Sequence, residues 1–296
     1  MIQLVKNQHY VPRGYLKNFA FGKKQHQIWR FSKINNKCVT NNINDIASEN
    51  YFYELPQKMA EKFHREIGYS DFNSTESFLS RFEDTCLPII KDILGACADF
   101  DNHRLNNIFI DSNYRGWLGT YLLIQNYRTK KFRKDIYNNE LIKLNNNFKH
   151  PRGENNNSPI SFQTTKEVAD TISILCQQIK MLDLNELNTE VNALINFVWF
   201  IGVNDTDIPF LTSDNPIIQF YVNFNEEYVK TWSIPINSKY MLVILFSTLS
   251  GSLGYLNSTF QALTVDDILQ YNKHQFDQSL EFIYCEKLIK DEYMKK

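Results

Sequence analysis

Cysteine is scarce in this sequence, and its pattern excludes two common classes of small-domain protein. The five cysteines are odd in number, and no two of them are spaced as CxxC. This pattern argues against a disulfide framework and against a structural zinc site. We therefore expect free, buried thiols in a reducing cytoplasm.

Long hydrophobic runs and an excess of one charge are also absent. The longest apolar runs, near residues 194–203 and 240–246, are too short to span a bilayer. The first ten residues contain no apolar signal-peptide core. The 32 basic and 33 acidic side chains give a net charge of −1, so no global field would hold a nucleic acid non-specifically. These absences predict a cytoplasmic protein with no membrane partner.

Familiar catalytic motifs are missing as well. The sequence contains no P-loop, no glycine fingerprint for a dinucleotide, no HExxH and no EF-hand loop. Ser213 lacks the GxSxG setting of a hydrolase nucleophile. A functional site therefore has to be sought among residues that break a structural pattern.

Hydrophobic periodicity predicts an α+β fold. Helices are expected at residues 75–98, 105–137, 165–181 and 264–279. Strands are expected at residues 27–32, 37–40, 194–203, 217–222, 228–236, 240–246 and 280–285. We predict a single domain over residues 1–296, in which an antiparallel or mixed sheet, mostly from the C-terminal half, packs against several long helices. The Asn-rich stretch near 138–160 is expected to form a flexible excursion.

The segment from residue 7 to residue 19 is dense in polar chemistry beside apolar anchors. His9, Tyr10, Arg13 and Tyr15 surround Pro12, which can open a helix as its first residue. Most chains fray this close to a terminus. We therefore expect this segment to be pulled inward, with other elements closing over it.

Five polar side chains occupy positions where the periodicity requires an apolar residue, or where a strand is interrupted. They are His9, Glu83, Arg128, Asp214 and Asn272. Buried polar groups find one another or remain costly, so we predict that the five converge and that Glu83 pairs with Arg128. An imidazole, two carboxylates, a guanidinium and an amide are the parts of an acid–base or phosphate-handling site.

A structural interpretation of the same residues is also open. Arg128 and Glu83 can pair simply to hold the N-terminal segment in place, and such buried pairs often add little net stability. His9 can be a hydrogen-bonded core histidine. Asp214-Asn215-Pro216 can be an Asx turn, because Asp and Asn side chains bond their own backbone in such turns.

Several motifs together resemble a known family, the domain-of-unknown-function family 4238. The resemblance rests on His9-Tyr10-Val11-Pro12-Arg13, Trp29-Arg30-Phe31, Glu49-Asn50-Tyr51-Phe52-Tyr53, the helix with Glu83, Tyr127-Arg128-Thr129, Phe210-Leu211-Thr212-Ser213-Asp214-Asn215-Pro216, Ser233-Ile234-Pro235-Ile236 and the helix with Asn272. Lys130 stands where members typically carry a proline, and Gly14 replaces a bulkier residue. Since the family is named for its unknown function, the resemblance implies which positions matter rather than what they do.

The first functional hypothesis is an enzyme acting on a phosphate-containing substrate, such as a nucleotide or a nucleic acid. The catalytic candidates are His9 as general acid or base, Arg128 as a phosphate clamp, and Glu83 with Asp214 to orient groups or hold a divalent ion. The substrate-binding candidates are Tyr10, Arg13, Asn215 and Asn272. The alternatives are a non-catalytic ligand-binding or sensing module, for instance in bacterial defence, and a scaffold with a purely structural polar network.

Overall fold

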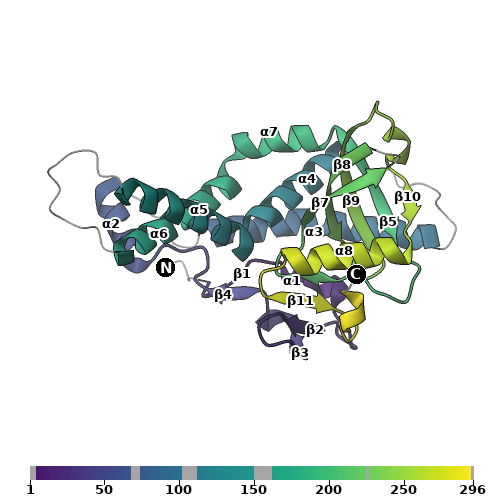
Figure 1. Cartoon of the computed structure of the whole chain (residues 1–296), viewed down its shortest axis with the longest axis horizontal. Coiled ribbons are helices and arrows are strands. Elements are labelled where there is room, and N and C mark those ends of the chain that lie inside the picture. The colour runs from purple at the N-terminus through teal and green to yellow at the C-terminus, as the bar shows by residue number, and fades with distance from the viewer. Residues whose placement is uncertain (1–4, 68–73, 102–111, 150–161, 225–226, 295–296) are drawn as a thin grey trace.

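The computed structural model describes residues 5–67, 74–101, 112–149, 162–224 and 227–294, and its α+β architecture agrees with the sequence-based prediction (Figure 1). The α-helices of this part are α1 (Arg13–Leu16), α2 (Gln57–Ile67), α3 (Ser74–Asp101), α4 (Ser112–Tyr127), α5 (Lys130–Lys149), α6 (Phe162–Leu182), α7 (Leu184–Leu194) and α8 (Val265–Gln278). The strands are β1 (Asn7–His9), β2 (Gln27–Ser32), β3 (Lys37–Asn42), β4 (Ser48–Asn50), β5 (Phe197–Val203), β6 (Thr212–Ser213), β7 (Ile218–Phe224), β8 (Glu227–Pro235), β9 (Tyr240–Thr248), β10 (Phe260–Ala262) and β11 (Phe282–Cys285). Among the described residues, all five cysteines are free, and no helix has the length and apolar character needed to cross a membrane.

The largest sheet has the strand order β10-β5-β9-β8-β7 and is mixed, because only β10 runs parallel to its neighbour. Side chains of a strand alternate between faces, so β5 supplies two separate cores. Trp199 and Ile201 pack in the core that contains the buried faces of α3 and α4, whereas Val198 and Phe200 pack in the core that contains Ile268 and Tyr271 of α8. Helices thus cover both faces of this sheet.

A second sheet joins the two ends of the chain. Its order is β3-β2-β11-β6, with antiparallel pairs throughout, so the β2–β3 hairpin lies beside the last strand (Figure 1). Helix α8, which leads into β11, begins with a capping box in which Thr264 and Asp267 satisfy each other's backbone amides. The expected closing helix and final strand are both present.

The N-terminal segment is buried, as its residue pattern predicts. Tyr10, Val11, Leu16 and Phe19 are each no more than 2% exposed and belong to the main core with α3 and α4. Tyr15 donates or accepts a hydrogen bond with the Thr212 hydroxyl at 2.9 Å and donates to the carbonyl of Pro235 at 2.8 Å. The segment is therefore held between the helices and both sheets.

Two expectations about the middle of the chain need correction. The helix expected at 105–137 is broken at Arg128 and Thr129 into α4 and α5, and Thr129 caps the second helix by accepting from the amide of Phe132 at 3.2 Å. The flexible excursion expected near 138–160 is helical as far as Lys149, and residues 150–161 lie outside the described part.

Near the start of the chain, Pro12 is the N-cap of α1 rather than its first residue.

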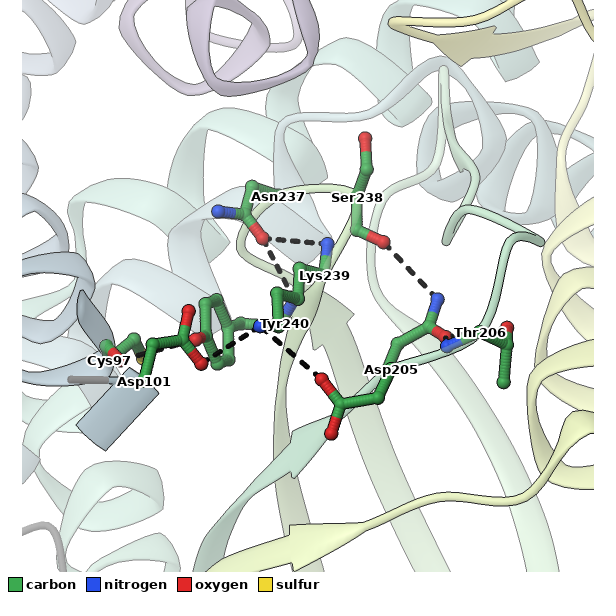
Figure 2. A network of polar contacts seen from close by, with 9 residues as sticks. Cys97, Asp101, Asp205, Thr206, Asn237, Ser238, Lys239 and Tyr240 are labelled. Carbon is green, nitrogen blue, oxygen red and sulfur yellow. Dashed lines mark hydrogen bonds and ion pairs between the residues drawn. The ribbon is translucent and has the colours of Figure 1, made fainter. Parts of the chain in front are cut away.

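One polar network ties the end of α3 to the turn between β8 and β9 (Figure 2). Lys239 pairs with Asp101 at 2.8 Å and with Asp205 at 3.3 Å, while Tyr240 donates to the carbonyl of Cys97 at 3.1 Å. The Asn237 side chain accepts from the amides of Lys239 and Tyr240 at 2.8 Å each, which fixes the turn. Since these contacts join backbone turns to a helix end, the network positions α3 against the large sheet.

Candidate functional site

The candidate site is centred on His9, at the end of strand β1. This strand pairs antiparallel with β4, opposite Ser48, Glu49 and Asn50. Gln8 is fully buried on the other side of the strand, where it accepts from the amide of Tyr53 at 2.7 Å and donates to Glu54 at 3.1 Å. These bonds fix the backbone of β1, and with it the position of the His9 imidazole.

Arg128 binds the same strand from the break between α4 and α5. Its Nη1 donates to Glu83 at 2.7 Å, its Nε donates to the Tyr53 hydroxyl at 3.2 Å, and its Nη2 donates to the carbonyl of His9. The side chain is 2% exposed. The predicted pair of Glu83 and Arg128 is therefore confirmed, and it brings together three of the five inward polar residues.

The pKa of Arg128 stays above its ordinary value in this setting. Burial alone would lower it, because a buried charge loses its hydration. Tyr53 and Glu83 outweigh that effect through their charges and hydrogen bonds. Arg128 is thus a fixed cation that bonds the protein through each of its three nitrogens, so it is a positioning group for β1.

The His9 imidazole is neutral at physiological pH. Its pKa is lowered to about 4, mainly by burial and further by Arg13 and Arg128, while a hydrogen bond with the backbone of Asn44 opposes the shift. Its Nε2 atom is buried and forms no hydrogen bond within the described part of the chain. An unpartnered buried nitrogen on a neutral ring can accept a proton from a bound group.

Glu76 is the member of the site that sequence reasoning missed. It lies seven residues before Glu83 on α3, which is about two helical turns and hence the same face of the helix. Its pKa is raised to about 7, mainly by burial and also by the charge of Glu83, while the charge of Arg128 opposes the rise. Its Oε2 atom is buried and has no partner among the described residues. The seven-residue spacing between Glu76 and Glu83 was the sequence signal that could have placed Glu76 on the same helix face.

The His9 cluster, as we call it from here, consists of His9, Tyr53, Glu76, Glu83 and Arg128. Arg13 adjoins it: this side chain is exposed, influences the pKa of both His9 and Glu76, and has one long contact, 3.4 Å, to the side chain of Asn44. Tyr10 turns into the core instead, with its ring 5.4 Å from that of Phe52 and 5.1 Å from the Lys130 ammonium. Its carbonyl accepts from Gln125 at 3.2 Å.

Asp214 belongs to a different set of contacts. Its carboxylate accepts from the amides of Leu280, Glu281 and Phe282, at 2.9, 2.6 and 3.0 Å. It is 1% exposed, and burial raises its pKa while these three amides oppose the rise. These bonds fasten the turn between β6 and β7 to the start of β11.

Asn215 and Asn272 hold the same region. Asn272 accepts from the amide of Leu211 at 2.9 Å and donates to the carbonyl of Pro209 at 2.9 Å. The Asn215 side chain donates to the carbonyls of Ile217 and Gln278, and its backbone N–H donates to the Ser213 hydroxyl at 2.9 Å. The turn is thus closed by the serine hydroxyl rather than by the Asp214 carboxylate of the Asx turn considered above. The five inward residues thus divide into the His9 cluster and a set of backbone braces around α8.

A metal site is not evident from this geometry. Within the described residues, no three His, Cys, Asp or Glu side chains lie close enough to hold a metal ion. Glu83 faces Arg128 and Asp214 faces three amides, so each carboxylate already has donors at short range. The expected pairing of Glu83 with Asp214 around a divalent ion has no geometric support here.

Two open pockets occur in the described part of the chain, and neither is lined by His9, Glu76 or Arg128. The first, of about 680 Å³, is lined by β4, α2, α5 and α6, and its charged walls include Glu49, Glu61, Asp170 and Arg133. The second, of about 530 Å³, lies between α5 and the segment Asn215 to Gln219. Both volumes fall in the range of small-molecule sites.

Comparison with known families supplies one match. The model of a family described as a protein of unknown function, DUF4238, matches residues 7–287. The chain belongs to the DUF4238 family. This match confirms the resemblance noted from the motifs and spans both the His9 cluster and the braces around α8. No curated protein and no solved structure matches this DUF4238 chain.

Proposed function

We propose that this DUF4238 protein is an enzyme in which His9 acts as general base and Glu76 as general acid. The observation that carries the proposal is the pair of buried, unpartnered atoms, His9 Nε2 and Glu76 Oε2, on groups with opposite pKa shifts. Near pH 6 the imidazole is neutral and the carboxyl is largely protonated. Two groups whose pKa values are shifted in opposite directions are typical of an acid–base pair in an active site.

The substrate class we propose is a phosphate-containing compound, a nucleotide or a nucleic acid. Arg13 supports this choice because it is exposed, lies within electrostatic range of both His9 and Glu76, and makes one long hydrogen bond, at 3.4 Å, to the described residues. An exposed guanidinium with free N–H groups can bind a phosphate through two parallel hydrogen bonds. Arg128 takes a supporting role, since its three donor nitrogens are bonded to the protein.

Asp214, Asn215 and Asn272 have no reacting role in this proposal. Each of them spends its hydrogen bonds on backbone groups of the segments around α8. We assign them to the stability of the fold. For Asp214 and Asn272, two of the five inward polar residues, this is the structural interpretation considered from the sequence.

The test is an activity screen on phosphate monoesters, phosphodiesters and nucleotides with three variants. His9→Ala is expected to lower the rate by about 10²–10⁴-fold, the usual contribution of a general base, with the fold retained. Arg13→Ala is expected to raise KM more than it lowers kcat. Asp207→Ala, at an exposed carboxylate in a loop, serves as the control. An active His9→Ala protein would refute the proposal.

A further inference from the structure

The pocket between α5 and the segment after Asp214 has an unusual wall. Five amide side chains face it, from four separate parts of the fold: Asn126, Asn139, Asn215, Gln219 and Gln278. The cavity measures about 530 Å³, which suits a small molecule. Amides both donate and accept, so this wall can match a ligand with adjacent donors and acceptors.

Two of the amides build the wall and three are available to a ligand. Gln278 bonds both the amide and the carbonyl of Gln219, at 3.0 and 2.7 Å, and the Asn215 side chain donates to the carbonyl of Gln278 at 3.2 Å. The side chains of Asn126, Asn139 and Gln219 form no hydrogen bond within the described part of the chain. Because the wall is fixed by its own hydrogen bonds and still presents unbonded amide groups, the site is preorganised for a ligand.

The charge of the wall indicates an uncharged ligand. Lys131 and Asp135 are its charged side chains, and they pair with each other at 2.7 Å. Phe132, Ile136 and Ile217 supply apolar surface in the same cavity. Aromatic and aliphatic walls favour the faces of a flat or cyclic compound.

From these features we infer that the cavity binds an uncharged ring compound carrying several hydrogen-bond donors and acceptors. Nucleosides and small sugars share this chemistry. The inference does not depend on the His9 cluster, since none of its members lines this cavity.

The experiment is isothermal titration of the full chain with a set of nucleosides in one arm and a set of mono- and disaccharides in the other. At least one compound is expected to bind, and the arm it comes from identifies the source. Asn139→Leu and Gln219→Leu are each expected to weaken its binding by about tenfold, the loss that accompanies one unmade hydrogen bond. Asn138→Leu, at the exposed neighbouring position on α5, is expected to bind like the unaltered protein.

Three results would overturn the inference. One is that no compound of either arm binds. Another is that Asn139→Leu and Gln219→Leu, both folded by circular dichroism, bind as well as Asn138→Leu. The last is an affinity that falls steeply with added salt, because an uncharged ligand has no ionic contact to screen. Should Gln219→Leu fail to fold, Asn139→Leu decides alone, since its side chain is exposed on a helix.

Discussion

At the scale of single residues, the buried polar groups are of two kinds, those with hydrogen-bond partners and those without. The first kind is satisfied: Asp214 receives three backbone amides and Asn272 both donates to and accepts from the backbone. The second kind is left open: eleven side chains in the described part of the chain carry a buried polar atom without a partner. Among these, His9 and Glu76 are the two whose shifted pKa values, about 4 and about 7, lie near the range where acid–base groups work, and we give these two a functional explanation.

Asp214→Ala tests the satisfied kind. The substitution leaves three backbone amides without an acceptor at a position that is 1% exposed, so we expect a loss of about 3–5 kcal/mol in unfolding free energy. Chemical denaturation at neutral pH measures it. Asp207→Ala, in an exposed loop, should change stability by no more than about 0.5 kcal/mol. Equal stabilities of the two variants would contradict the bracing role.

His9 makes stability depend on pH in a predictable direction. Its pKa is about 4 when folded and 6.5 when unfolded, so between these values the unfolded chain binds more protons. The neutral form's contribution to stability is complete above pH 6.5 and is lost as the pH falls toward 4, by at most about 3 kcal/mol. Comparing His9→Gln with the unaltered protein by urea unfolding, at neutral pH and near pH 4.5, isolates this contribution. The variant should lose less stability on acidification, and an identical loss in both proteins would count against the shift.

Glu76 works in the opposite sense. Its folded pKa is raised to about 7, so its protonated form adds stability at low pH, and this contribution is lost as the pH rises through 7. Glu76→Gln, which mimics the protonated state, should therefore be relatively more stable above neutral pH than below pH 4.5. Thermal melts across that range provide the measurement. A variant with unchanged pH dependence would show that the carboxyl is not shifted.

At the scale of elements, the site depends on a short strand held by a helix break. Strand β1 has only three residues, and a two-stranded ribbon of this length is not stable alone. Arg128, at the junction of α4 and α5, fixes it by donating to the carbonyl of His9 while Glu83 of α3 compensates its charge. Three helices and a strand thus meet at one guanidinium.

Arg128→Met removes this junction. Glu83, the Tyr53 hydroxyl and the His9 carbonyl would all lose their donor, and breaking a buried pair costs about 3–5 kcal/mol. Hydrogen exchange of residues 7–10 should accelerate far more than that of β9 in the large sheet. Lys131→Met, at a partly exposed pair three positions later, is the control and should leave exchange at β1 unchanged. Uniform acceleration over the whole chain would argue that Arg128 has no particular hold on the N-terminal segment.

The elements also show what the sequence could predict. Periodicity placed Glu83 and Arg128 on the inner faces of their helices, and their pairing followed. It could not find the break at Thr129, because the apolar pattern continues through that residue and only the cap to Phe132 interrupts the helix. The partners of Asp214 are backbone amides more than sixty residues later in the chain, and backbone donors leave no mark on a residue pattern.

At the scale of the whole molecule, the segments near the two ends of the chain meet in one sheet. The N-terminal segment lies in the main core with α3 and α4, while Tyr15 reaches β6 and the end of β8. Strand β11, near the end of the chain, lies beside β2 (Figure 1) and also pairs with β6. The His9 cluster and the amide-lined cavity therefore belong to one folded unit, and we expect both to be lost together on global unfolding.

The central claim is that His9 is a neutral base held ready inside the fold. Its most direct test is a titration of the His9 imidazole by nuclear magnetic resonance in the folded protein, with His9→Gln used to assign the signal. We predict a midpoint near pH 4, set by burial and by Arg13 and Arg128. A midpoint near 6.5, the ordinary value for histidine, would contradict the claim.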